Sequence, residues 1–574
     1  MTTQFDNKSA DASAKTSLCE MAKGAAIVGG AFSIIVFGLL VVNYLQIKLL
    51  DPLRTERLET LKIKLLEQPK DEQLLSQIRE LDLQIRKDKI RQRDFSQKGS
   101  MFLFGAVAVF LIGIKAVKAC KRRLPCPSVP VDLQIQQVHQ AVRARWVMTA
   151  GLGLLAAAAL FFISTDKVDF FQAGVSYPSN EEIAKNWPTF RGPQGSGFSM
   201  YSNIPDKWDG KSGEAIKWKS EIPLTGHNSP VVWDDRVFIS GANKQKRQVY
   251  CFDAVSGKLL WQADVVNPAS TAEKVIELDE GTSYAAPTVA TDGTRVCAIF
   301  PNGDVGCFDF EGKKLWSRNL GLPESIYGYA SSLAIYQNLL LIQYDQGMAD
   351  DGKSRMYALD TFSGMTVWEV KRDVPSSWTS PIVAKIGDQS QLITCGDPWV
   401  IAYDPLNGTE LWRLDCLGTD VAPSPIYAGG LVFAIKPYSR LIAIKPTGQG
   451  DVTDTHIAWE ADDSGPDICS PVSNGQLIFT LESQGFLTCY NVTDGTKLWE
   501  KDLEVNFMSS PSIVGDRLYL LSEKGVMFII KIGGEYEELA KCELSEDCFA
   551  SPAFKDGRVY IRAVKNLYCI GSKN

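Results

Sequence analysis

The sequence predicts an all-β eight-bladed propeller preceded by an α-helical membrane region with three transmembrane helices. One strand–turn–strand unit recurs eight times after residue 215, and three long uncharged runs lie before residue 166. A repeat of about 40 to 55 residues suits a four-stranded propeller blade with its loops. The two kinds of pattern do not overlap, so the chain divides into an apolar N-terminal part and a repetitive C-terminal part.

Each repeat opens with a small residue, usually followed by proline, and continues into strands that end at an Asp-x-x-x-Gly turn and a Trp. Two clear copies end in FDAVSGKLLW (252–261) and YNVTDGTKLW (490–499). Apolar runs such as LLLIQY (339–344) read as strands inside the blades. The openings are Ser229-Pro230, Ala286-Pro287, Ser331-Ser332, Ser380-Pro381, Ser424-Pro425, Ser470-Pro471, Ser510-Pro511 and Ser551-Pro552.

The repeated residues are expected to build the ring rather than to perform chemistry. Glycine accepts the positive φ of a tight hairpin, and the aspartate accepts hydrogen bonds from backbone N–H groups of the same turn. A Trp at the end of the outer strand can wedge between blades and still offer its N–H to a partner. The predicted blade-docking tryptophans are Trp218, Trp261, Trp316, Trp368, Trp412, Trp459 and Trp499.

The last repeat stops before its outermost strand, whereas a strand without a blade follows Ala215 and contains Trp218. Pairing of this N-terminal strand with the final repeat would close the ring and remove its open sheet edges. The sequence therefore predicts a closed circle of eight blades. The seventh repeat has lost its Trp, and the fifth has an irregular turn around Gly448.

Hydropathy divides the rest of the chain. The three apolar runs are near the roughly 20 residues that a bilayer requires. Between the first two, leucine and isoleucine recur at helical spacing on both sides of Pro69, which predicts a helical hairpin; a solvated amphipathic helix without a partner is an equal alternative. The predicted segments are a tail (1–23), a first span (24–47), the charged hairpin (48–98), a second span (99–117), a basic loop (118–145), a third span (146–165), a linker with a lead-in loop (166–214) and the propeller (215–574).

Basic residues in the loops predict the orientation. The loop 118–145 is rich in Lys and Arg and has a single acid, Asp132, which favours a cytoplasmic location. The basic residues of 48–98 oppose this assignment. The expectation is a multi-pass protein of the inner membrane with its propeller on the periplasmic side.

Composition excludes several classes of function. The net charge of −7 offers no concentrated basic face, so no nucleic-acid partner is expected. The three histidines are scattered without metal-ligand spacing, and no metal is expected. The thirteen cysteines contain no C-x-x-C motif and mostly lie in apolar strand-like runs, so they are interpreted as buried free thiols.

The Asp-x-x-x-Gly-Lys-x-x-Trp pattern resembles the tryptophan-docking motif of quinoprotein-type propellers, whose PQQ-like repeats form eight-bladed alcohol dehydrogenases. The same fold occurs in the lipoprotein subunit of the outer-membrane β-barrel assembly machinery. The lead-in NWPTFRGPQGSGFS (186–199) is also similar to bacterial membrane-anchored PQQ-binding-like repeat proteins. The resemblance covers about residues 187–574. The resemblance indicates the fold far more specifically than the function, because proteins with the same propeller fold perform many functions.

Two functions follow from this resemblance. The first is a non-catalytic scaffold or ligand-binding module of the bacterial cell envelope, with other envelope proteins as partners and an unknown oligomeric state. The alternative is a PQQ-dependent oxidoreductase with Ca²⁺. Such enzymes resemble one another in having a disulfide between two adjacent cysteines, and some carry a C-x-x-C-H haem motif. This chain has neither an adjacent cysteine pair nor that motif. The sequence therefore favours the scaffold without a cofactor.

A ligand site, if present, is expected where the innermost strands begin, at one mouth of the central channel. Aromatic, carboxylate and amide side chains there could hold a planar ligand. The alternative is that they plug the channel or bind a ring of waters. The candidate residues are His227, Asn228, Tyr284, Tyr329, Trp378, Asp420, Asp467, Asn506 and Phe549.

Overall fold

The computed structural model describes residues 24, 26–40, 99, 103–118, 177–265, 282–462 and 465–572. The chain forms two compact units, Met1–Lys167 and Val168–Asn574. The whole predicted hairpin (48–98), the basic loop (118–145) except Lys118, and the whole third predicted span (146–165) lie outside the described residues. Each unit is considered by itself below.

In the first unit, residues 26–40 and 103–118 are helical. They pack closely at small residues: a Cβ built on Gly29 would lie 3.1 Å from the Ala106 carbonyl oxygen, and one on Gly113 would lie 2.9 Å from the Ala26 Cβ. Within the described residues, no helix has both the length and the apolar character that crossing a membrane requires. The prediction of three transmembrane helices is therefore wrong.

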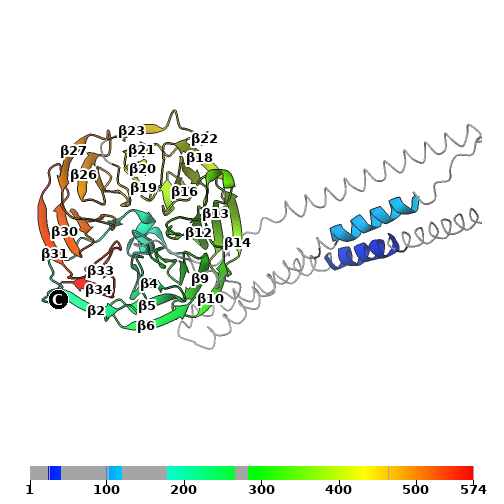
Figure 1. Cartoon of the computed structure of the whole chain (residues 1–574), viewed down its shortest axis with the longest axis horizontal. Helices are drawn as coiled ribbons and strands as arrows, with labels where there is room; N and C mark the ends of the chain where they lie inside the picture. Colours follow the sequence, from blue (N-terminus) through cyan, green and yellow to red (C-terminus); the bar gives the residue numbers. More distant parts are fainter. Residues whose placement is uncertain are drawn as a thin grey trace, which may run out of the picture. The chain divides into compact units, whose positions relative to one another are not determined.

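The second unit is a ring of eight β-sheets (Figure 1). Each sheet is an antiparallel meander whose first strand lies nearest the ring axis. The strands of the first four blades are β3 (Val231–Trp233), β4 (Arg236–Ala242), β5 (Arg247–Asp253) and β6 (Leu259–Asp264); β7 (Ala290–Thr291), β8 (Arg295–Ile299), β9 (Asp304–Asp309) and β10 (Lys314–Asn319); β11 (Ala334–Tyr336), β12 (Leu339–Tyr344), β13 (Arg355–Asp360) and β14 (Thr366–Lys371); and β15 (Ile382–Ile386), β16 (Gln389–Gly396), β17 (Trp399–Tyr403) and β18 (Glu410–Asp415).

The remaining four blades follow in chain order around the ring. Their strands are β19 (Ile426–Ala428), β20 (Leu431–Lys436), β21 (Arg440–Ile444) and β23 (Ile457–Ala461); β24 (Val472–Ser473), β25 (Leu477–Leu481), β26 (Phe486–Asn491) and β27 (Lys497–Asp502); β28 (Ser512–Val514), β29 (Arg517–Leu521), β30 (Val526–Lys531) and β31 (Glu538–Glu543); and β32 (Ala553–Lys555), β33 (Arg558–Arg562), β34 (Asn566–Gly571) and β2 (Ile216–Glu221). Two further short strands, β22 (Gly450–Asp451) and β1 (Phe198–Ser199), join blades 4 and 7.

The ring closes as the sequence predicts. Strand β2 pairs antiparallel with β34 (Figure 1). Within this pair, Trp218 lies opposite Cys569. The eighth blade thus combines the two ends of the propeller. This pairing removes the open edge that the last sheet would otherwise present, and the prediction of eight blades is confirmed.

Hydroxyl groups link the blades near the axis. The backbone N–H of one opening residue donates to the side-chain hydroxyl of the next blade, at 2.9 to 3.0 Å, from Ser229 around to Ser551. Blade 2 opens with Ala286, and Thr288 supplies the hydroxyl in its place. The repeated serine of the sequence pattern is therefore the acceptor of an inter-blade hydrogen bond.

Tryptophans link the blades near the rim. In six of the seven, the indole N–H donates to a carbonyl oxygen in the turn of the following blade, at 2.8 to 3.1 Å. Under five of them lies the turn glycine: a Cβ on Gly408, for example, would meet the Trp368 ring at 2.7 Å. The exception is Trp412, which donates to the Gln391 side chain because the next turn is irregular.

Blade 7 has Ala540 where other blades have Trp, and the lead-in segment (residues 177–214) covers that junction. Trp208 is buried there in a core that includes Cys542 and Leu544. The phenol of Tyr519 donates to the Pro205 carbonyl oxygen, and Arg517 pairs with Asp206 at 2.7 Å. A tryptophan from outside the repeats thus replaces the one that the repeat has lost.

The lead-in segment also fills the centre of the ring (Figure 1). It contains α4 (Asn180–Ala184), η1 (Pro193–Gly195) and β1, and a third short helix, η2 (Ala349–Asp351), lies in blade 3. Trp187 pairs with Val232 of blade 1, and Arg191 donates to the carbonyl oxygen of Pro471 in blade 6. The lead-in segment therefore contacts blades 1 and 6 of the ring directly.

One cysteine prediction is wrong. Cys297 and Cys307 lie opposite each other on β8 and β9 and form a disulfide. Cys542 and Cys548 are free, as are six other cysteines of the described region, which agrees with the interpretation as small apolar residues.

Candidate functional site

The two ends of the ring differ. We call the end at which the innermost strands begin the opening face, and the opposite end, with the turns after the first and third strands, the turn face. All nine predicted ligand residues precede innermost strands and therefore belong to the opening face. The structure shows which of them remain available there.

The side chain of Asn228 is held by hydrogen bonds within the ring. It is buried, and its side-chain amide donates to the carbonyl oxygens of Ser240 at 2.8 Å and Ala285 at 2.7 Å. Its side-chain oxygen accepts from Arg562 of blade 8, whose guanidinium is buried without a carboxylate partner among the described residues. Burial lowers the pKa of Arg562 to about 9. These bonds join blades 1, 2 and 8.

His227 lies against this buried cation. Its ring is 4.7 Å from that of Phe549. Burial, followed by the charge of Arg562, lowers the pKa of His227 to about 4. The imidazole is therefore neutral at pH 7 and packs as an aromatic ring.

The other predicted residues do not converge on one pocket. The buried Tyr329 donates its hydroxyl to the Gln343 carbonyl oxygen at 3.0 Å, and Asp467 accepts from the Ser483 hydroxyl at 2.7 Å. Tyr284 is half-buried and packs beside the core of blades 1 and 2. Asp420 and Asn506 are exposed. Whether any of the nine binds a ligand stays a prediction.

Aromatic side chains gather instead over blades 3 to 5. Trp378 donates its indole N–H to the Gly328 carbonyl oxygen at 2.9 Å, and its ring lies 5.2 Å from that of Tyr327. Ile326 is 77% exposed, Tyr327 is 47% exposed and Tyr438, at the tip of the turn between β20 and β21, is 79% exposed. We call these four residues, Ile326, Tyr327, Trp378 and Tyr438, the aromatic patch.

Tyr438 is held in an unusual backbone conformation. Its φ is 56°, in the left-handed region that β-carbon-bearing residues avoid. Its backbone N–H donates to the Gly465 carbonyl oxygen at 2.7 Å. A Cβ on Gly465 would lie 2.1 Å from the backbone nitrogen of Ser439, so only glycine fits there. A neighbouring loop thus holds the backbone that carries this exposed aromatic ring.

Acidic residues border the aromatic patch. Partial burial and then the charges of Asp467, Tyr327 and Asp420 raise the pKa of Tyr438, which places all of them within electrostatic range of one another. Two of the residues predicted from the sequence, Asp420 and Asp467, therefore belong to the surroundings of the patch. Sequence reasoning found Trp378 and missed the other three. The signal for Tyr438 was an aromatic residue inside a Pro-Tyr-Ser-Arg turn between two strands.

No group of three or more His, Cys, Asp or Glu side chains that could hold a metal ion occurs in the described ranges. The disulfide joins residues ten positions apart rather than adjacent cysteines. The geometry of the opening face thus consists of an exposed, anchored aromatic patch with carboxylates at its border.

One solved structure shares the ring. A quinohemoprotein alcohol dehydrogenase from Pseudomonas putida HK5 aligns with a TM-score of 0.52 and 12% identity, over 69% of this chain and 82% of its own. BamB from Moraxella catarrhalis aligns with a TM-score of 0.46 and 16% identity, over 62% of this chain and 99% of its own. At 12% identity, the alignment with the quinohemoprotein alcohol dehydrogenase shows the fold alone.

A curated relative is the outer membrane protein assembly factor BamB of Alkalilimnicola ehrlichii. It is 24% identical over 228 residues, or 39% of this chain, and the chain spans about half (52%) of that relative's length. The predicted inner-membrane, multi-pass location is wrong: it depended on membrane-spanning helices that the described residues do not contain, and the relative is named for the outer membrane.

A family profile matches the propeller directly. It covers residues 207–299, 303–467 and 456–533, which is more than half of the chain and reaches from the closing strand into blade 7. The expected resemblance to PQQ-like repeat propellers is confirmed. The chain belongs to the family described as outer membrane protein assembly factor BamB.

Proposed function

We propose that this protein is a non-catalytic interaction scaffold of the bacterial envelope, which binds another protein of outer-membrane assembly through the aromatic patch. The observation that carries the proposal is the exposure of Ile326, Tyr327 and Tyr438 on a rigid ring. Tyrosine and tryptophan are the side chains that most often dominate protein–protein interfaces.

The patch is built to stay exposed. Trp378 is anchored by its bond to Gly328, and Tyr438 by the bond to Gly465. Because the loops are fixed before binding, little conformational entropy is lost when a partner docks. Strained residues persist where the surrounding structure holds them, and they are frequent at binding sites.

The acidic residues near the aromatic patch indicate which charges a partner surface should carry. Asp420 and Asp467 lie within electrostatic range of Tyr438, so a partner surface with apolar side chains bordered by Lys or Arg would be complementary. Charges at the rim of an interface raise association rates more than affinity. The association should therefore slow with added salt.

We propose that the protein acts without PQQ, Ca²⁺ or another cofactor. The dehydrogenase likeness concerns only the fold, and the chain has no adjacent cysteine pair. Incubation of the purified protein with PQQ and Ca²⁺ should leave no bound-quinone absorption and no dye reduction. A stoichiometric quinone spectrum would refute this part of the proposal.

The decisive experiment is site-specific photo-cross-linking in intact cells with the full-length chain. A photo-reactive phenylalanine analogue replaces Tyr438, and the matched control carries it at Leu498, which is similarly apolar and partly exposed but lies on the outer strand β27. Irradiation should give one adduct at position 438 that contains a second outer-membrane assembly protein, and none at position 498.

A double variant, Tyr327→Ala with Tyr438→Ala, tests the energetics. Co-purification of the cross-linked partner should fall at least tenfold, because two exposed aromatic contacts are removed. The melting temperature should change little, since both side chains are largely exposed. Equal recovery of the partner with the double variant would show that the aromatic patch is not the docking site.

A further inference from the structure

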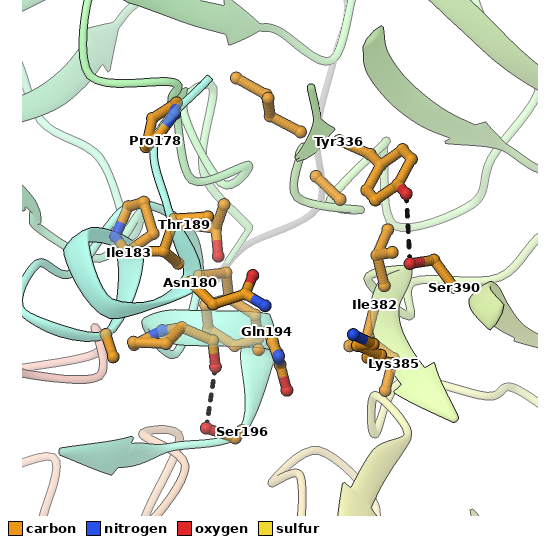
Figure 2. Close-up of a pocket in the computed structure, with 18 of the residues that line it drawn as sticks. Pro178, Asn180, Ile183, Thr189, Gln194, Ser196, Tyr336, Ile382, Lys385 and Ser390 are labelled. Carbon is orange, nitrogen blue, oxygen red and sulfur yellow. Dashed lines mark hydrogen bonds between the residues drawn. The ribbon is translucent and has the colours of Figure 1, made fainter. Parts of the chain in front are cut away.

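A cavity of about 630 Å³ lies on the turn face, inside the ring. Figure 2 shows its two walls: Pro178, Asn180, Ile183, Thr189 and Gln194 of the lead-in segment face Tyr336, Ile382, Lys385 and Ser390 of blades 3 and 4. Asn180 and Lys385 are exposed, so the cavity opens to solvent. Its volume is within the range of ligand sites, and the aromatic patch lies on the other face.

The wall formed by blades 3 and 4 contains open sheet edges. Strand β15 pairs with β16 on one side, and β11 pairs with β12. No segment in the described part of the chain pairs with the opposite, channel-side edge of either strand. An open edge is a template for another extended chain.

The lead-in segment already uses the same kind of edge in three other blades. Trp187 and Val232 exchange two backbone hydrogen bonds of 2.8 Å at blade 1, and the Thr291 N–H donates to the Pro188 carbonyl oxygen at 2.9 Å at blade 2. At blade 7, β1 pairs parallel with β28. An extended main chain therefore fits against the inner edge of a blade, inside this channel.

We propose that the cavity binds an extended peptide segment of another protein as an added strand on the channel-side edge of β15. Main-chain hydrogen bonds would supply the affinity and alternate side chains the selectivity, as in other cases of strand addition. Gly195 of η1 packs against Ile382, the first of the five residues of β15. The remaining residues would accept a partner strand of about four residues, at about 3.3 Å per residue.

The lining indicates the side chains of that segment. Apolar contacts come from both walls, from Ile183 and Phe190 on one and Ile382 on the other, whereas polar groups of Gln194, Tyr336 and Ser390 also line the cavity. The Tyr336 hydroxyl donates to the Ser390 hydroxyl at 3.2 Å. Lys385 and Asp388 bring opposite charges to the same strand turn. The segment should therefore be uncharged and alternate between small apolar and hydroxyl side chains.

The test uses the full-length protein and a fluorescent nine-residue peptide of alternating threonine and valine with a lysine at each end. Its fluorescence anisotropy should rise saturably with protein concentration. A second peptide of the same sequence, methylated at every backbone nitrogen, keeps the side chains and loses all N–H donors. Its affinity should be at least tenfold lower, because it cannot form the ladder of hydrogen bonds.

Two protein variants locate the site. Asn180→Trp fills the cavity from an exposed position on α4, and Glu181→Trp places the same ring on the adjacent exposed residue, which does not line the cavity. Asn180→Trp should weaken peptide binding at least tenfold and Glu181→Trp less than twofold, with unchanged circular dichroism. Absence of saturable binding, equal binding of the methylated peptide, or equal effects of the two variants would each overturn the proposal.

Discussion

The turn face and the opening face of the ring are built for different tasks. On the turn face, tryptophans donate to the turns of neighbouring blades and the lead-in segment crosses the centre, so most large side chains are satisfied within the chain. On the opening face, two loops hold Tyr438 and Trp378 in place while much of their neighbourhood stays exposed. The contrast indicates that the tryptophan contacts of the turn face supply stability, whereas the opening face leaves the aromatic patch exposed.

Substitution of a docking tryptophan should have the largest effect on stability. Trp368 is 8% exposed, and its N–H donates to the Pro405 carbonyl oxygen at 3.1 Å. Trp368→Ala leaves a cavity between blades 3 and 4 and should lower the free energy of unfolding by about 3–5 kcal/mol. Urea denaturation followed by tryptophan fluorescence measures the loss. A cost below about 1 kcal/mol would contradict the assignment of stability to the turn face.

Trp208 should follow with a somewhat smaller effect. It is 3% exposed and covers the junction where blade 7 carries Ala540. Trp208→Ala should cost about 2–4 kcal/mol, because the lead-in segment can close part of the space. The matched double variant, Trp208→Ala with Ala540→Trp, tests whether the original position can accept the ring. Recovery of stability in the double variant would show that the two tryptophans are alternatives.

The ring could be predicted from the sequence because each repeat contains the residues that mark where a blade begins, turns and contacts the next blade. Openings, turns and tryptophans recur in register, and the unpaired strand at Trp218 had one possible partner. Trp208 was not found, because it lies outside the repeat and replaces a missing residue from a distant part of the chain. The three spans were predicted from apolar runs alone, and no helix of the described residues is long and apolar enough to cross a membrane.

The disulfide shows why the register between strands is needed in addition to the sequence pattern of the cysteines. Four blades carry a cysteine at the same place in the third strand, and the residue opposite is Phe238, Phe479 or Tyr560 in three of them. Only in blade 2 is the opposite residue another cysteine, Cys297 across from Cys307. Taken one strand at a time, the cysteines resemble small apolar residues, and the pairing emerges only when the strands are aligned.

The candidate residues of the opening face differ in exposure, which the sequence did not predict. The side chains of Asn228 and Tyr329 form hydrogen bonds between blades or within one blade, whereas the side chain of Tyr438 is exposed. Whether a channel residue is buried depends on the width of the ring and on neighbouring loops. Neither quantity is encoded in the local sequence of a single repeat.

His227 allows a smaller, pH-dependent test of the opening face. Its folded pKa of about 4 lies below the ordinary value of 6.5, so between these values the unfolded chain binds a proton that the folded chain does not. Stability should therefore fall as the pH drops from 6.5 to 4. Because the ring is partly exposed, we expect a share of about 1–2 kcal/mol. The difference between wild type and His227→Gln, measured by urea denaturation at each pH, isolates it. A pH-independent difference would refute the assignment.

Substitution of Tyr438 should give the smallest change in the free energy of unfolding. It also distinguishes the role of the opening face from that of the turn face most clearly. The Tyr438 φ of 56° is unfavourable for tyrosine and costs glycine little. Tyr438→Gly should therefore raise the free energy of unfolding by about 0.5–1 kcal/mol after the greater flexibility of glycine in the unfolded chain is allowed for. Tyr438→Ala keeps the strain and should change stability by less than about 0.5 kcal/mol.

Both Tyr438 variants should lose the partner equally, because both remove the aromatic ring from the patch. Urea denaturation and co-purification of the cross-linked partner therefore report on different properties of the same residue. A gain in stability together with a loss of binding would mean that the chain keeps a strained residue for recognition. If Tyr438→Gly instead destabilised the protein, the ring of Tyr438 would be a packing element, and the opening face would share the structural role of the turn face.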